Sequence, residues 1–305
     1  DTRPTSAPAA ASRTVARRSR HGHIRVTARS HPRGRRGARW GATVWNAARR
    51  RPRPLPLPGD APAHVRVLRL VLADGATTTL HVAAYDAART GVRVVRFARP
   101  TRLAAWCAEH DAREAIVGGF FVRACGRPLG EVRTSGIARA SVPFAAPWDA
   151  ARACVHTQGG RVAIARRPDL PARPQGDLLQ AGPLLVRDGR PCVAGDPEGF
   201  AAGAAQFDSD ITAGRHPRAA LALARHGRLL AVAADGRGDD DAGLTLSELA
   251  DALVRLGARH ALNLDGGGSA SLVCGGALRN RPREAHGIEL AGGRPVATAL
   301  AFTPR

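Results

Sequence analysis

Apolar and polar residues alternate from residue 64 to residue 86, which is the first regular pattern in the chain. Such alternation is typical of half-buried strands, and the Asp74-Gly75 pair in its middle is typical of a tight turn. This segment therefore predicts a β-hairpin. Similar patterns predict two more hairpins, at residues 153–165 with a turn at Gly159-Gly160 and at residues 219–237 with a turn at His226-Gly227.

Shorter apolar runs predict strands at residues 115–122, 181–189 and 262–264, the first of them interrupted by Gly118-Gly119. Helical spacing of apolar residues appears at residues 101–111, where Thr101 is the expected N-cap, and at residues 244–257. Thr245 and Glu248 have the spacing of a capping box. Strands outnumber helices and many form hairpins. The sequence thus predicts an α+β fold with a mixed, mainly antiparallel sheet and a few packed helices.

The segment at residues 1–60 lacks these patterns. It holds fifteen arginines and two aspartates, so the net charge of +21 for the whole chain falls to +8 for the remainder. One interpretation is an arm that binds nucleic acid or an acidic surface. We favour a disordered leader, because residues 49–60 have no periodicity and no interleaved aromatic residues. The predicted organisation is a leader at residues 1–60 and a single domain at residues 61–305.

Composition adds few constraints. All 46 basic residues are arginine, which with the abundant Ala, Gly and Pro indicates a GC-rich, bacterial genome. There is no run of about 18 apolar residues, so no membrane span is expected. No signal peptide is visible, and a cytoplasmic location is the expectation. The five cysteines are scattered without a CxxC pair, which favours buried apolar residues over a metal site. No cofactor or metal is expected.

The sequence ALNLDGGGSASLV at residues 261–273 contains three consecutive glycines. Its spacing excludes a P-loop, a dinucleotide-binding fingerprint and a nucleophile elbow. Asp265 follows an apolar strand, and glycines allow backbone N–H groups to converge on an anion, with the Ser269 and Ser271 hydroxyls as further donors. The alternative is a structural turn in which Asp265 bonds to its own backbone.

This stretch does not stand alone. HPRAAL at 216–221, DGR at 235–237, residues 242–273 and NRP at 280–282 resemble, in this order, the phosphodiester glycosidase family. Matching segments also occur at 118–121, 128–132, 181–189 and 293–302, so the resemblance covers residues 66–302. Two departures are Val117, where the family often has asparagine, and the poorly matching residues 284–293.

The resemblance implies cleavage of the bond between a sugar's anomeric carbon and a phosphodiester oxygen. The leaving phosphate needs cations or N–H donors, and the oxocarbenium-like sugar needs a carboxylate. The candidate carboxylates are Asp265 and Asp235, followed by Glu284, and His216 is a candidate proton donor. The candidate substrate-binding residues are Arg218, Arg237, Asn263, Gly266, Gly267, Gly268, Ser269, Asn280, Gly118 and Gly119. The acidic run at residues 239–241 is interpreted as a solvated loop rather than a cation site.

The expected function is that of a hydrolase acting on a sugar-1-phosphodiester in a glycan, a cell-envelope polymer or a nucleotide-like conjugate. Two alternatives remain open. The first is a non-catalytic sugar- or phosphoglycan-binding protein of exopolysaccharide assembly. The second is a protein that binds nucleic acid through its arginine-rich leader.

Overall fold

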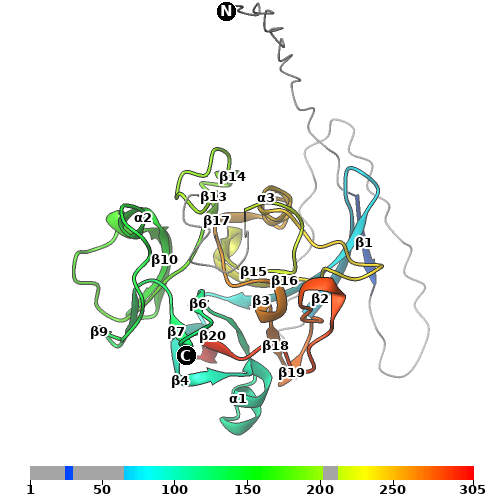
Figure 1. Ribbon diagram of the computed structural model, residues 1–305. Coiled ribbons are helices and arrows are strands. Elements are labelled where there is room, and N and C mark those ends of the chain that lie inside the picture. The colour runs from blue at the N-terminus through cyan, green and yellow to red at the C-terminus, as the bar shows by residue number, and fades with distance from the viewer. Residues whose placement is uncertain (1–24, 30–64, 202–211) are drawn as a thin grey trace, which may run out of the picture.

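The computed structural model describes residues 25–29, 65–201 and 212–305. Its largest sheet has eight strands in the order β1-β2-β3-β16-β15-β17-β13-β14 (Figure 1). The strands span Arg25–Arg29, Val65–Val71, Thr77–Asp86, Arg228–Ala234, Arg218–Ala224, Ala258–Asn263, Leu184–Arg187 and Arg190–Pro191, in that order. Neighbouring strands of this sheet are antiparallel.

Two five-stranded sheets and a short hairpin complete the strands. One sheet has the order β19-β18-β5-β20-β4, with bounds Ala277–Leu278, Leu272–Cys274, Ala115–Val117, Val296–Pro304 and Thr90–Thr101. The other has the order β11-β10-β12-β8-β9, with bounds Arg161–Arg166, Ala153–Gln158, Asp177–Gln180, Val132–Thr134 and Ile137–Ala138. The hairpin joins β6 (Phe121–Val122) to β7 (Arg127–Pro128).

The described part of the chain has three α-helices: α1 (Leu103–Glu109), α2 (Trp148–Ala151) and α3 (Leu246–Arg255). The expected antiparallel sheet with a few helices is therefore confirmed, but the protein is richer in strands than a balanced α+β fold. The physical reason is that few segments carry helical periodicity. No helix of the described residues is long and apolar enough to cross a membrane.

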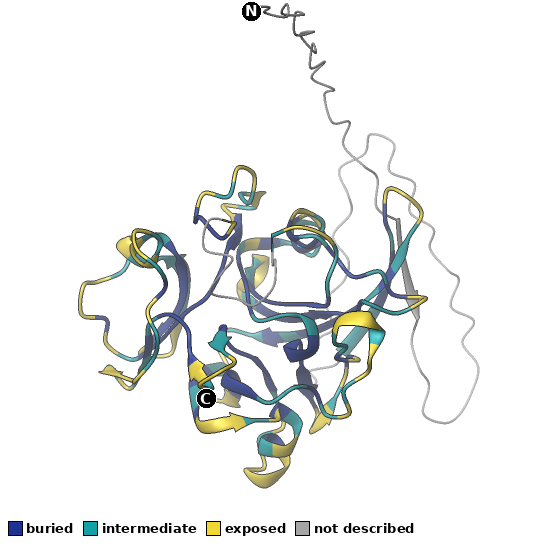
Figure 2. Cartoon of the chain, viewed as in Figure 1, coloured by how far each residue is buried: buried dark blue, intermediate teal, exposed yellow. Residues whose placement is uncertain are grey.

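The centre of the eight-stranded sheet is buried on both faces (Figure 2). In β15, Ala219 and Leu221 face the core shared with the two five-stranded sheets, whereas Ala220 and Ala222 face the core beneath α3. Strand β16 alternates in the same way. Because both faces need apolar side chains, these strands are almost continuously apolar, and the predicted hairpin with its turn at His226-Gly227 is confirmed.

Helix α3 confirms its predicted start. The Thr245 side chain accepts from the Glu248 N–H at 3.1 Å, and Glu248 accepts from the Thr245 N–H at 2.9 Å, which completes the capping box. The N-cap expected for α1 is wrong by one residue. Arg102 occupies that position, and the Thr101 hydroxyl instead donates to the Arg99 carbonyl at 2.8 Å.

Strand β1 lies within the predicted leader and pairs with β2, with Arg25 opposite Val71. These five residues of the predicted leader therefore form a strand rather than irregular structure. The rest of the leader lies outside the described residues, so the domain boundary at residue 60 stays a prediction.

Candidate active site

The glycine-rich loop between β17 and β18 is hydrogen-bonded to two other loops. The Asp265 N–H donates to the carbonyl of Gly118, between β5 and β6, at 3.0 Å. The Gly267 N–H donates to the carbonyl of Pro217, just before β15, at 2.8 Å. Three segments that are distant in sequence, each containing a candidate residue, therefore meet at Asp265.

Close approach explains the first two glycines. A Cβ atom at Gly266 would lie 2.8 Å from the Pro217 carbonyl oxygen. This clash could not be relieved by a side-chain movement, because the oxygen belongs to the backbone. Gly267 has φ of +59°, and a Cβ there would lie 3.1 Å from Nη1 of Arg237. The N–H groups of both glycines are used inside the protein, because the Gly266 N–H donates to Asp265 Oδ1 at 2.8 Å. These two N–H groups are therefore not free to converge on an anion, as the sequence had suggested.

The third glycine lies against an ion pair. A Cβ at Gly268 would lie 2.9 Å from Oε1 of Glu284, and Arg294 Nε donates to that oxygen at 2.7 Å. The Arg294 N–H also donates to the Gly268 carbonyl at 2.9 Å, and its Nη1 lies 3.5 Å from the buried Ser269 hydroxyl. The Arg294 charge is thus anchored beside the loop by backbone and side-chain bonds.

Asp265 is a partly buried carboxylate in this surrounding. Burial raises its pKa to about 6. Hydrogen bonds from the Ser269 hydroxyl and the Gly266 N–H act in the opposite direction, as do the charges of Arg294 and Arg123. A carboxylate with a pKa this close to neutrality can both accept and release a proton at physiological pH.

Arg237 contributes a second cation. Its backbone has φ of +59°, a conformation that non-glycine residues rarely adopt and that often marks functional sites. Its Nη2 lies 3.2 Å from His216 Nδ1, and its Nη1 donates to the Arg283 carbonyl at 3.3 Å. Burial lowers the pKa of Arg237, Glu284 raises it, and Arg294 and Arg123 lower it. The positive charges of Arg237, Arg294 and Arg123 therefore lie close enough to repel one another.

The sequence interpretation missed Arg123 and Arg294. Arg123 is exposed in the turn after β6, and its charge acts on Asp265, Glu284 and Arg237. Its position directly after the GGFFV segment was the available signal. Arg294 follows the poorly matching residues 284–293, and no spacing relates it to the loop that it contacts.

Arg218 is the first residue of β15 and is buried. It is 3% exposed, and its Nε and Nη2 donate to the carbonyls of Leu244 and Gly214 at 2.9 and 3.4 Å. These bonds hold the segment before β15 against the segment before α3. His216 is linked to the glycine-rich loop through its contact with Arg237. Its Nε2 atom is 2.9 Å from the Ala213 carbonyl oxygen.

Both carboxylate oxygens of Asp235 form hydrogen bonds within the protein. Oδ2 lies 2.7 Å from His81 Nε2, and Oδ1 accepts from the Arg281 N–H at 2.7 Å. Asn280, next to Arg281, accepts from the Leu272 N–H at 2.9 Å and donates to the Ala270 carbonyl at 2.7 Å. Together they tie the loop after β19 to the sheet and to the end of the glycine-rich loop.

Asn263 is 1% exposed at the end of β17. Its Nδ2 donates to the carbonyls of Gly182 and Leu264 at 2.9 Å each, and its Oδ1 is buried without a hydrogen-bond partner. Gly119, also proposed for substrate binding, donates through its N–H to Thr298 Oγ1 at 3.0 Å.

The structure also places the acidic, histidine and cysteine side chains that could bind a metal. No group of three or more His, Cys, Asp or Glu side chains there could hold a metal ion. In the acidic run at residues 239–241, Asp241 is buried and accepts from Arg69 Nη1 and the Thr79 N–H at 2.7 Å each. The five cysteines are free. Three are buried as expected, but Cys192 is half-buried and Cys125 is exposed.

Comparison with protein-family models identifies one family. A family model described as phosphodiester glycosidase matches residues 110–303. Among solved structures, the zebrafish N-acetylglucosamine-1-phosphodiester alpha-N-acetylglucosaminidase catalytic domain, auto-inhibited by its pro-peptide, is similar with a TM-score of 0.62 and 18% identity, over 81% of this chain and 85% of that chain.

A Synechocystis protein is also similar, with a TM-score of 0.53 and 20% identity, over 81% of this chain and 64% of that chain. A Burkholderia pseudomallei protein has a TM-score of 0.54 and 18% identity, over 78% of this chain and 76% of that chain. No curated protein sequence matches. At these identities the solved structures support the fold alone.

Proposed function

Because the chain belongs to the phosphodiester glycosidase family, we propose that it hydrolyses the bond between the anomeric carbon of a sugar and a phosphodiester oxygen. The products are a free sugar and a phosphate monoester. One observation carries the proposal more than any other: a carboxylate with a pKa raised to about 6, Asp265, lies within the electrostatic reach of the arginines around the glycine-rich loop.

The arginines suit the leaving group. A phosphate monoester leaves as an anion and needs little help from an acid, but its charge must be held as the C–O bond breaks. Arg237, Arg294 and Arg123 supply that positive charge beside the loop. The planar guanidinium group can donate two parallel hydrogen bonds to phosphate oxygens.

Asp265 suits the other half of the reaction. The anomeric carbon becomes positively charged in the transition state, and a nearby carboxylate stabilises it. Asp265 accepts a proton from the attacking water, the water oxygen bonds to the anomeric carbon, and the C–O electron pair leaves with the phosphate. Asp235 is a positioning residue in this proposal, because both of its oxygens are engaged with His81 and the Arg281 N–H.

The test is turnover of a panel of methyl sugar-1-phosphodiesters in water enriched in ¹⁸O, with the full chain. We expect release of free sugar and methyl phosphate, and no label in the phosphate. Label in the phosphate would mean cleavage of the P–O bond and would overturn the proposal. Saturable binding without turnover across the panel would instead identify a non-catalytic sugar-phosphate-binding protein.

A further inference from the structure

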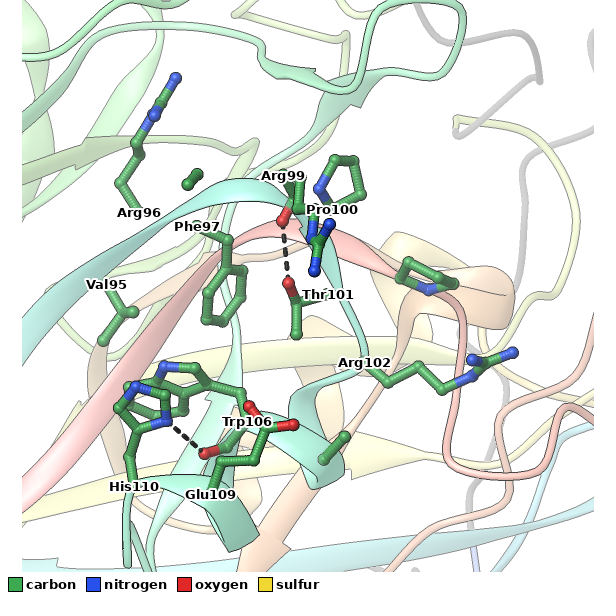
Figure 3. A pocket seen from close by; sticks show the side chains of 13 residues that line it. Val95, Arg96, Phe97, Arg99, Pro100, Thr101, Arg102, Trp106, Glu109 and His110 are labelled. Atoms are coloured by element: carbon green, nitrogen blue, oxygen red, sulfur yellow. Dashed lines mark hydrogen bonds between the residues drawn. The ribbon is translucent and has the colours of Figure 1, made fainter.

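A second feature, separate from Asp265, is a pocket of about 520 Å³ along the end of β4 and the start of α1 (Figure 3). Three arginines, Arg96, Arg99 and Arg102, contribute to its lining, together with Phe97, Trp106 and Pro295. The function derived above uses none of these residues.

An irregularity in the sheet makes this pocket. Val296 of β20 pairs with Thr101, whereas Thr298, two residues later, pairs with Arg96. Two steps along β20 therefore span five along β4, and the residues between Arg96 and Thr101 bulge out of the sheet. The Thr101 hydroxyl fixes the bulge by donating to the Arg99 carbonyl at 2.8 Å. The bulge carries the Arg99 side chain away from the sheet.

The pocket has an excess of positive charge. Arg99 and Arg102 are exposed, and the Arg96 Nε atom is buried without a hydrogen-bond partner. Within the described residues, none of these three arginines forms an ion pair with a carboxylate, and Glu109 is the single acidic residue in the lining. In Figure 3 the Arg99 and Arg102 side chains lie where β4 leads into α1, whereas the Arg96 side chain extends from the opposite side of β4 to Phe97 and Trp106.

The wall of the pocket is aromatic. Phe97 and Trp106 pack edge to face with ring centroids 5.6 Å apart, and His110 stacks on Trp106 with centroids 4.9 Å apart. Trp106 is half-buried. An apolar wall beside the exposed guanidinium groups of Arg99 and Arg102 fits a ligand with C–H surface and anionic groups, such as a phosphorylated sugar chain.

Two contacts connect the pocket with the edge of the Asp265 site. A Cβ atom at Gly126 would lie 2.6 Å from Cγ of Pro100 in the bulge, and Gly126 ends the turn that begins at Arg123. On the other side, a Cβ at Gly292 would lie 3.5 Å from Cδ of Arg102, and Arg294 follows two residues later. Both cations missed by the sequence interpretation thus belong to segments that pack against this pocket.

We propose that this pocket binds phosphate groups of a phosphate-containing glycan chain, one linkage of which is cleaved at Asp265. The inference rests on the proposed function and names its substrate class. A chain with repeating phosphodiesters presents further anions on either side of the bond that is cleaved. The exposed guanidinium groups of Arg99 and Arg102 would hold such neighbours, whereas a small phosphodiester would not reach them.

The experiment compares two substrates of the same linkage, a sugar-phosphate polymer and the methyl sugar-1-phosphodiester. The test variant is R99Q/R102Q, and the matched control is R190Q/R259Q, which removes two exposed arginines, Arg190 on the edge strand β14 and Arg259 near the start of β17. We expect the KM for the polymer to rise about tenfold or more in the test variant, which corresponds to about 1.4 kcal/mol. Turnover of the methyl phosphodiester should change less than about twofold in either variant.

Calorimetric binding of the polymer to the parent and both variants separates failure of the pocket from failure of the catalytic proposal. Polymer binding lost only in R99Q/R102Q, without turnover of either substrate, would support the pocket and overturn the hydrolase. Normal turnover with equal polymer binding and KM in all three proteins would overturn the pocket. Single-stranded DNA that binds as tightly as the polymer and displaces it would also overturn the proposal, because the ligand would then be nucleic acid.

Discussion

Two opposing influences act on the Asp265 carboxyl, and their balance determines how the protein responds to pH. Burial favours the protonated form and raises the pKa to about 6, while Ser269, the Gly266 N–H, Arg294 and Arg123 favour the carboxylate. Because burial is the larger influence, part of the Asp265 population is protonated below neutral pH, where it cannot accept a proton from water.

We therefore expect kcat/KM for a methyl sugar-1-phosphodiester to fall as the pH drops through about 6. R294Q removes a cation near Asp265, so the acid limb of its pH profile should move to higher pH. R190Q is the control, because Arg190 lies on β14 at the far edge of the eight-stranded sheet. A profile that stays flat between pH 4.5 and 8 would contradict a catalytic role for this carboxylate.

Gly267→Ala tests whether the loop positions Arg237. The new methyl group would lie 3.1 Å from Arg237 Nη1 at a backbone with φ of +59°. We expect KM to rise more than kcat falls, because the displaced cation binds the phosphate, and stability to fall by about 1 kcal/mol. Gly276→Ala is a matched control, since its φ is +76° but nothing lies within 4 Å of its Cβ. Equal effects on KM in both variants would refute the role given to Gly267.

Sequence reasoning selected Asp265 as a candidate because the residue follows an apolar strand and precedes glycines, which are local features. It could not separate Arg237 from Arg218, since both follow or begin strands in matching motifs. Their difference is tertiary: Arg218 is buried against the Leu244 carbonyl, whereas Arg237 faces Gly267. Arg294 was missed because its contact with Gly268 joins segments without any shared sequence pattern.

At the scale of elements, the loop after β19 is held by side-chain bonds to backbone. Asn280 satisfies the Leu272 N–H and the Ala270 carbonyl, both next to the glycine-rich loop. Asp235 holds the Arg281 N–H from the other side. These bonds link the glycine-rich loop to β16 and β18 and give the NRP segment a structural role.

Asn280→Ala should lower the free energy of unfolding by about 2 kcal/mol or more, because it leaves a buried N–H and a buried carbonyl unpaired. Denaturant unfolding gives the value. Asn280→Asp keeps the acceptor for the Leu272 N–H but places a carboxylate oxygen against the buried Ala270 carbonyl, so it should destabilise the protein at least as much. Unchanged stability of the alanine variant with a raised KM would return Asn280 to the substrate-binding role that the sequence suggested.

The strands and turns could be predicted from the sequence, because the alternation of apolar and polar residues and the glycine-containing pairs are local signals. The hairpins at β2–β3, β10–β11 and β15–β16 follow from such signals. The N-cap of α1 was not readable, since Thr101 is used by the bulge of β4, and that bulge exists because β4 pairs with β20, the last strand of the chain. The order of strands in the sheets has the same long-range origin.

At the scale of the whole molecule, the glycine-rich loop and the pocket lined by Arg96, Arg99 and Arg102 both lie on the body formed by residues 65–201 and 212–305. The arginine-rich segment at residues 1–60 contributes β1 to an edge of the eight-stranded sheet. Every residue assigned here to catalysis or binding lies beyond that segment, and α3 covers the sheet nearer its other edge through β13, β14 and β17.

A chain that begins at Ala61 should therefore fold and keep turnover within about twofold of the parent. Loss of β1 leaves β2 as the edge strand, and this short edge pairing contributes little to a core built from the central strands. Thermal unfolding and turnover on the same substrate measure the effect. An insoluble or inactive product, beside an active parent, would place the arginine-rich segment within the domain.

The central claim is that the glycine-rich loop brings substrate to the Asp265 carboxylate. Asp265→Asn, assayed on a sugar-1-phosphodiester that the parent cleaves, should lower kcat at least about 100-fold, as expected for a positioned acid–base group. Because the pKa of Asp265 is raised by folding, its contribution to stability is lost as the pH rises through about 6. The neutral variant should thus unfold at pH 7 at a temperature no lower than the parent. Near-parent turnover with a lower unfolding temperature would show that Asp265 is a turn residue and would contradict the account.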